Sequence, residues 1–184
     1  VDPSSAIPSI KSGGIDLYFD GLRVDDYLAA KQDPDLETAL ANGLYYELTL
    51  NPSGPEFLDG RLNPFSSPKI REALNWLIDR SHISTAILNT SASEKFFPIV
   101  VGYPDYERYS VKVAALEAEY AYNFSQAQAA ISAEMLTLGA NLNGGVWYYE
   151  GNPVVLIFLI RSDSDGNRLP MGDYVSDQLE KAGF

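Results

Sequence analysis

Apolar residues recur at helical spacing in the stretch NPFSSPKIREALNWLIDR, residues 63–80. Their steps of three and four residues place them along one face of a helix. Ser67 is a natural N-cap, and Pro68 stands at the first helical position, where proline is tolerated best. The pattern predicts a helix that begins at Ser67 and packs one side against another layer. The residues of this apolar stripe are Ile70, Ala73, Leu74, Leu77 and Ile78.

Other stretches have the patterns of β-strands. Residues 44–50 (LYYELTL) alternate between two faces and predict a half-buried strand. Residues 154–160 (VVLIFLI) form a continuous apolar run, typical of a buried strand, which we expect to pair with residues 146–149 in a hairpin. Residues 15–22 (IDLYFDGL) predict a short strand that ends in an Asp-Gly turn.

The remaining pattern predicts mainly helices. Residues 24–43 suit one or two short helices, broken at Pro34 and closed by Gly43. Residues 1–14 predict a flexible lead-in, and residues 96–110 an irregular connector. Further helices are expected at 81–89, 111–121, 125–139 and 171–183.

Helices that alternate with strands indicate one α/β domain over residues 1–184. A helix packed on a sheet normally leads into another strand, and the final helix has none after it. The first predicted strand likewise has no earlier strand to pair with. We therefore expect the chain to be a partial lobe excised from a larger protein.

The charge balance narrows the class of partner. The chain has 25 acidic and 13 basic residues, a net charge of −12, and no run of basic residues. Nucleic acid and anionic membrane surfaces are therefore poor partners, since both require clustered Lys and Arg.

The absence of cysteine excludes disulfides, thiolate catalysis and thiolate metal sites. The longest apolar run, 154–160, is far too short to span a bilayer.

No residue pattern indicates catalysis. His82 is the only histidine and lies in a predicted helix, so we interpret it as structural or solvent-facing. The stretch DSDGN, 163–167, resembles the start of a calcium loop, but residues 168–170 cannot supply the further ligands, and a turn is the better interpretation. Paired carboxylates such as 25–26 are interpreted as solvated surface, because nothing predicts the pKa separation that acid–base catalysis needs.

The 12 tyrosines offer candidate binding residues. Tyr45 lies beside Glu47 on the polar face of the strand predicted at 44–50, where its ring could stack on a ligand or its hydroxyl could bond one. The alternative is that Tyr45 packs beneath a helix. Tyr103, Tyr106 and Tyr109 form either the rim of a site or a well-packed connector.

Several segments in a fixed order carry a resemblance to a known family. The strand predicted at 44–50 ends at Asn51 and is followed by Pro64-Phe65 and the helix containing REAL and IDR. YAYNFSQAQAAISAEMLTLGA at 120–140, the strand and helix of 152–184, and SIKSGGIDLYF at 9–19 complete the order. Together they resemble family 5 extracellular solute-binding proteins, the peptide-binding components of ABC transporters. The chain departs from that pattern in a longer loop at 52–63, and in Asn-Phe-Ser at 123–125, where Asp-Pro is common.

The resemblance implies an α/β lobe of the type II periplasmic-binding-protein fold, a mixed β-sheet flanked by helices. It implies a protein without enzymatic activity, cofactor or metal, which closes two lobes on a solute like a hinge. The implied partners are a peptide ligand and ABC transporter permease subunits, at the cell surface or in the periplasm. Any membrane contact would come through an anchor absent from this chain.

The resemblance also places the strand predicted at 44–50 near the ligand cleft, which nominates Tyr45 and Glu47 as ligand-binding residues. An oligosaccharide or a nickel chelate could replace the peptide. Two rival classes stay open: a glycosidase-like domain using two carboxylates, and a purely structural cell-surface module. We expect Arg71 to pair with Glu47, Asp79 or another carboxylate.

Overall fold

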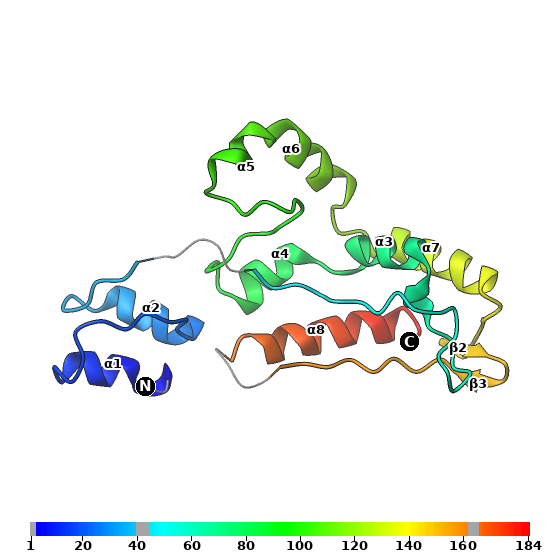
Figure 1. Ribbon diagram of the computed structural model, residues 1–184, viewed down its shortest axis with the longest axis horizontal. Coiled ribbons are helices and arrows are strands. Elements are labelled where there is room, and N and C mark those ends of the chain that lie inside the picture. Colours follow the sequence, from blue (N-terminus) through cyan, green and yellow to red (C-terminus); the bar gives the residue numbers. More distant parts are fainter. Residues whose placement is uncertain (1–2, 40–44, 162–165) are drawn as a thin grey trace.

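The computed structural model describes residues 3–39, 45–161 and 166–184, and contains helices with one small antiparallel sheet (Figure 1). The α-helices are α1 (Pro3–Lys11), α2 (Val24–Gln32), α3 (Pro68–Leu77), α4 (Arg80–His82), α5 (Pro104–Arg108), α6 (Ser110–Glu119), α7 (Phe124–Thr137) and α8 (Arg168–Lys181). A 3₁₀ turn, η1 (Pro64–Ser66), precedes α3, and a π-helical turn, η2 (Ile83–Ile87), follows α4. The strands are β1 (Asn141–Asn143), β2 (Val146–Tyr149) and β3 (Asn152–Pro153), in the order β1-β2-β3.

The main core forms where α3 packs on α7, as the apolar stripe predicted. Ile70, Ala73, Leu74 and Leu77 are all buried, while Ile78 is half-buried at the C-cap of α3. Helix α7 presents buried residues at four-residue steps: Ala127, Ile131 and Met135. Helix α8 adds Val175 and Leu179 to the same core. A narrow stripe on each helix therefore suffices to bury this interface.

The Pro-Phe turn before α3 is held by side chains that bond backbone groups. Asn63 is buried, and its side-chain oxygen accepts a hydrogen bond of 3.1 Å from the backbone N–H of Phe65, capping η1. Arg71 Nη1 donates to the carbonyls of Phe65 at 2.6 Å and Ser66 at 3.0 Å. The described structure gives Arg71 these carbonyl partners instead of Glu47 or Asp79, which corrects the expectation of a carboxylate partner.

Trp147 on β2 joins the sheet to the end of α8. It is the largest fully buried side chain among the residues that the structure describes. Its indole nitrogen donates to the carbonyl of Ala182 at 2.9 Å, and its backbone N–H donates to the carbonyl of Gly183 at 2.9 Å. A Cβ atom on Gly183 would lie 2.9 Å from the indole ring. Glycine is therefore required here both for close approach and for the backbone φ of +98°.

Three predicted strands are not formed. Residues 15–22 and 45–50 have no regular structure, and Leu44 lies outside the described residues. The hairpin reaches only β2 and β3, and residues 154–160 continue as extended chain without strand pairing among the described residues. The large mixed sheet that was expected is thus reduced to three short antiparallel strands.

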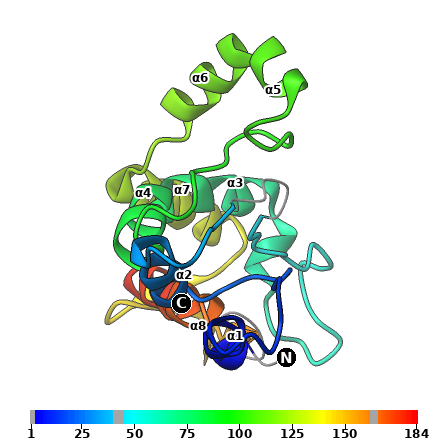
Figure 2. The ribbon, with the colours of Figure 1, turned by 90° about the vertical axis from the view of Figure 1, so that its left-hand side faces the viewer.

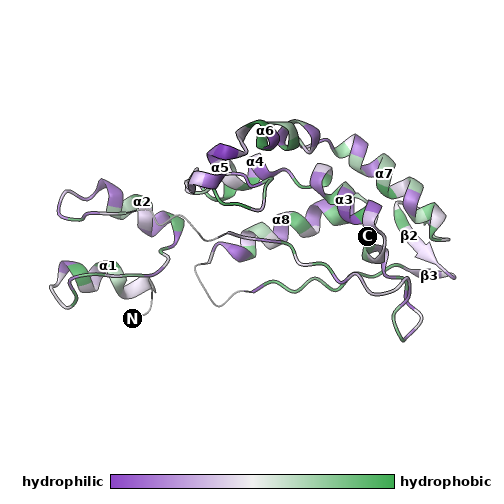
Figure 3. Ribbon diagram, turned by 45° about the horizontal axis from the view of Figure 1, so that its top comes forward, coloured by the Kyte–Doolittle hydropathy of each residue, from purple (hydrophilic) through white to green (hydrophobic). Residues whose placement is uncertain are grey.

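The period-2 alternation of residues 154–160 is nevertheless present in their burial. Val154 is buried, and Leu156 and Phe158 pack half-buried against the core. The intervening residues face solvent, with Ile157 80% and Leu159 91% exposed. In Figure 3 this segment appears as a hydrophobic extended ribbon running alongside α8. An extended chain sets the alternation by itself, whereas the hydrogen-bonded ladder needs a partner strand.

The N-terminal region forms two short helices beside the main body (Figure 1). Helix α1 occupies residues that were predicted to be a flexible lead-in. Lys11 at its end forms an ion pair with Asp33, just beyond α2. Val24 of α2 joins Leu88 and Met171 in a second, smaller hydrophobic cluster. Helix α2 ends before Pro34 as predicted, while the predicted end at Gly43 lies outside the described residues.

Helices α5 and α6 form an arm that projects from the body (Figure 2). Helix α5 is a regular element inside the connector that was predicted to be irregular. Trp76 of α3 anchors the arm, because its indole nitrogen donates to the carbonyl of Glu119 at 2.8 Å and its ring lies 5.7 Å from that of Tyr120. Helices α4, α6, α7 and α8 confirm the periodicity at 81–89, 111–121, 125–139 and 171–183.

Candidate functional site

A cavity of about 560 Å³ opens between the α5–α6 arm and the region of α4 and η2. Its lining combines carboxylates, one guanidinium, hydroxyl groups and aromatic rings. Cavities of this size and mixed chemistry are typical of ligand sites. The polar and aromatic lining residues are Asp79, Arg80, Ser81, Ser84, Ser93, Glu94, Phe96, Tyr106, Glu117, Tyr120 and Tyr122.

The Asp-Arg pair that ends the sequence motif forms the body side of this cavity. The Asp79 carboxylate accepts a hydrogen bond of 3.1 Å from the backbone N–H of His82 and so caps α4. The backbone N–H of Asp79 donates to the Tyr174 hydroxyl at 3.1 Å. The Asp79 side chain therefore serves as the N-cap of α4, and Arg80 follows it as the first residue of that helix.

Arg80 is held on two sides. Its Nη2 donates to Asn75 Oδ1 at 2.6 Å and its Nη1 to the Asn75 carbonyl at 3.2 Å. The guanidinium lies 4.5 Å from the centroid of the Phe96 ring, in cation–π geometry. Burial lowers the pKa of Arg80, and the negative charge of Glu94 opposes that shift. The side chain is thus a fixed, partly desolvated positive charge at the cavity wall.

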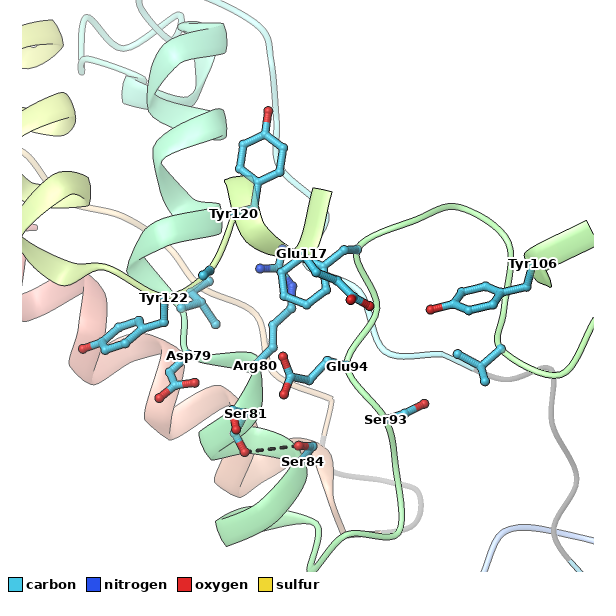
Figure 4. A pocket seen from close by; sticks show the side chains of 14 residues that line it. Asp79, Arg80, Ser81, Ser84, Ser93, Glu94, Tyr106, Glu117, Tyr120 and Tyr122 are labelled. Atoms are coloured by element: carbon cyan, nitrogen blue, oxygen red, sulfur yellow. Dashed lines mark hydrogen bonds between the residues drawn. The ribbon is translucent and has the colours of Figure 1, made fainter. Parts of the chain in front are cut away.

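The arm supplies the opposite wall. Figure 4 shows Arg80, Glu94 and Glu117 close together around the cavity, with the Tyr106 hydroxyl directed toward them from the arm. Burial raises the pKa of Tyr106, and the nearby charges of Glu117 and Glu107 raise it further. Tyr106 therefore stays a neutral hydroxyl that can donate or accept a hydrogen bond.

The two residues nominated from the sequence lie outside this cavity. Tyr45 is 53% exposed, and the Lys95 ammonium lies 3.9 Å from the centroid of its ring. Glu47 is exposed on the same irregular segment. Lys95 stands between Glu94 and Phe96, both of which line the cavity, so Tyr45 borders the segment that forms the wall.

Sequence reasoning singled out only part of the cavity. Tyr106 belongs to the tyrosine group that was expected to form either a rim or a packed connector, and it forms a wall. Glu94 and Glu117 gave no signal, because they lie 23 residues apart on different elements and only the folded arm brings them to one cavity. Arg80 was recognised as part of a motif but not as a cavity residue.

His82 lies beside a second, smaller cavity of about 410 Å³. Its side chain is exposed, and its ring stacks on Tyr174 with a centroid distance of 4.7 Å. This agrees with the structural, solvent-facing role predicted for it. Of the calcium-like stretch 163–167, residues 163–165 lie outside the described residues.

Two further features concern the described residues as a whole. Within ranges 3–39, 45–161 and 166–184, no three His, Asp or Glu side chains are grouped so that they could hold a metal ion. Every helix that the structure describes is too short or too polar to cross a membrane.

A fixed guanidinium, carboxylates and aromatic rings around an open cavity are groups that can orient a polar solute. The family model for bacterial extracellular solute-binding proteins, family 5 Middle, matches residues 1–184, and the chain belongs to this family. Peptide-binding ABC transporter components are the general kind in this family, and its members are not enzymes. The glycosidase-like alternative is therefore wrong. A comparison with curated proteins gave no match.

Proposed function

We propose that this chain forms part of one lobe of a two-lobe solute-binding protein, which captures a peptide outside the cytoplasmic membrane and delivers it to an ABC transporter permease. The observation that carries the proposal is the open cavity of charged and aromatic side chains, on a chain that belongs to a solute-binding family. Closure of a second lobe over such a wall would bury the solute and create the form that the permease recognises.

The assignment to a partial lobe of the type II fold is supported by the solvent-facing side of residues 154–160. Val155, Ile157 and Leu159 place three apolar side chains on one exposed face. Exposing such a face in water is unfavourable by about 25 cal/mol for each Å² that a neighbouring layer would bury. Further strands beside this segment and beside residues 45–50 would complete a mixed sheet flanked by α3, α7 and α8.

Tyr45 and Glu47 are proposed to contact the solute at the edge of the cavity. One face of the Tyr45 ring is covered by Lys95, which also positions the ring beside the wall segment. A ring held in this way can stack on a peptide side chain, and it can equally stack on a sugar. An oligosaccharide is therefore the second candidate ligand.

The test is a thermal-shift screen of the intact protein against short peptides and oligosaccharides, followed by calorimetric titration. A true solute raises the melting temperature in proportion to the logarithm of its concentration above Kd. We expect Tyr45→Ala to weaken binding about tenfold, the loss expected for an aromatic contact. Tyr46→Ala is the matched control, because the Arg168 guanidinium lies 5.3 Å from the Tyr46 ring centroid, away from Lys95.

An intact, folded protein whose melting temperature responds to no solute would contradict the proposed function. It would favour a purely structural surface module instead. A response to sugars alone would replace the peptide with an oligosaccharide and keep the binding role.

A further inference from the structure

The charges around the cavity are unequal. Asp79, Glu94 and Glu117 bring three carboxylates to its wall, against the single guanidinium of Arg80. Asp79 and Arg80 are both engaged by the protein, the first as a helix cap and the second by Asn75 and Phe96. Within the part of the chain that the structure describes, Glu94 and Glu117 have no cation within ion-pair distance. The cavity wall therefore carries more negative than positive charge, and Arg80, which interacts with the charge of Glu94, offsets only part of it.

The uncharged part of the wall suits an organic cation. Tyr106 directs a hydroxyl toward Glu117, and such an oxygen accepts hydrogen bonds from an ammonium or a guanidinium (Figure 4). A ligand cation carries several N–H donors on a compact head, and two carboxylates with a hydroxyl offer matching acceptors. The apolar stem of a basic side chain would lie against the aromatic wall that includes Phe96.

The alternative ligand classes fit less well. A carboxylate or phosphate would face Glu94 and Glu117, and both terminal nitrogens of Arg80 already donate to Asn75. A bare metal ion would need oxygen ligands converging at short range, and the described residues contain no group of three His, Asp or Glu able to hold one. An organic cation needs only charge of the opposite sign within a larger space.

We propose that this cavity is the subsite for a basic side chain of the captured solute, with Glu94 and Glu117 as the charged residues that select it. The inference rests on the proposed function in taking the ligand to be a solute that the cavity receives. It adds to that function a ligand class, namely peptides that contain lysine or arginine.

The experiment is a calorimetric titration of the intact protein with two pairs of tripeptides of otherwise identical sequence. One pair compares lysine with norleucine at the central position, and the other compares arginine with citrulline. We expect each basic peptide to bind at least about tenfold more tightly than its neutral counterpart, because a charged hydrogen bond is lost in the latter. Agmatine, a free organic cation without a peptide backbone, serves as a third probe.

The matched variants are Glu94→Gln, Glu117→Gln and Glu180→Gln. All three remove one carboxylate, but Glu180 is exposed on α8 and does not line the cavity. The first two should each weaken binding of the basic peptide about tenfold and leave the neutral peptide unchanged, whereas Glu180→Gln should bind both as the unchanged protein does. Equal losses in all three variants would overturn the assignment, since they would reflect net charge alone.

The outcomes separate this inference from the proposed function. Equal binding of basic and neutral peptides would disprove the cation subsite and leave solute binding intact. Glu117-dependent binding of agmatine without binding of any peptide or sugar would confirm the subsite and contradict the proposed solute. Binding of no probe at all would contradict both.

Discussion

Ser67 Oγ donates a hydrogen bond of 2.8 Å to Glu134 Oε1, joining the N-cap of α3 to the last turn of α7. The sequence predicted Ser67 as the N-cap, and Ser67 does occupy that position, but its hydroxyl does not cap α3. Lys69 Nζ donates to the other carboxylate oxygen of Glu134 at 3.0 Å. The start of α3 thus serves to bind a second helix, and Glu134 is bonded through both oxygens.

Stability should depend on the ionisation of Glu134. Lys69 and then Ser67 lower the pKa of its carboxyl below the ordinary value of 4.5. A lowered pKa in the folded state stabilises the protein above the unfolded-state value, and this contribution disappears as the pH falls through the folded-state value. Glu134→Gln removes this carboxyl. We therefore expect the unfolding free energy of the variant to fall less between about pH 5 and about pH 3 than that of the unchanged protein. Urea denaturation at the two pH values measures the difference.

The hydrogen bond itself is measured by a double-mutant cycle. Ser67→Ala and Glu134→Ala, each of which removes one partner of the bond, should be coupled by about 1 kcal/mol at pH 7. Purely additive effects at pH 7 would show that the Ser67–Glu134 contact contributes nothing.

The packing of α3 on α7 should dominate the stability of the body. Ile131 is fully buried in this interface, so Ile131→Ala should lower the unfolding free energy by about 2–5 kcal/mol. Leu136 lies on the same helix and is 59% exposed, so Leu136→Ala should change it by less than about 1 kcal/mol. Chemical denaturation of both variants gives the comparison, and similar losses would contradict the assigned interface.

The close approach of Gly183 to Trp147 can be separated from backbone strain. Gly183 and Gly145 have similar positive φ angles of +98° and +86°, and alanine is strained at both. Only at Gly183 would the added Cβ meet the indole ring, whereas at Gly145 nothing lies within 4 Å. Gly183→Ala should therefore destabilise by about 1–3 kcal/mol more than Gly145→Ala. Equal melting temperatures would show that the indole does not restrict this position.

Trp76 should control how firmly the arm is attached. It reaches the arm through a hydrogen bond to the Glu119 carbonyl and a ring contact with Tyr120. Trp76→Leu removes both, so hydrogen exchange should become faster in α5 and α6 and stay nearly unchanged in the buried turns of α7. Uniformly faster exchange across both regions would instead indicate global destabilisation.

Features that depend on the spacing of neighbouring residues were predictable from the sequence, whereas features that depend on contacts between distant residues were not. Helices α3 and α7 were predictable because the spacing of Ile70 and Leu77, or of Ala127 and Ile131, is a local property of each helix. The alternation of residues 154–160 was also local and is present in the structure. Their strand pairing was not predictable, since a ladder depends on a partner elsewhere.

The cavity depends on longer-range geometry still. Arg80 lies in a recognisable motif, but nothing in its neighbourhood indicates that Phe96 will cover it or that Glu117 will face it. Those relations arise only in the folded chain, where residues 93–101 and the α5–α6 arm lie opposite the region of α4. Tyr45 was nominated from a strand pattern, and the irregular course of residues 45–50 places it beside the wall without lining it.

The central claim is that this chain is one wall of a receptor that closes around its solute. Small-angle X-ray scattering of the intact protein, with and without a saturating solute identified by titration, tests it most directly. The account predicts a smaller radius of gyration in the bound state, because hinge closure brings two lobes together. Identical scattering curves in the presence of saturating solute would contradict it.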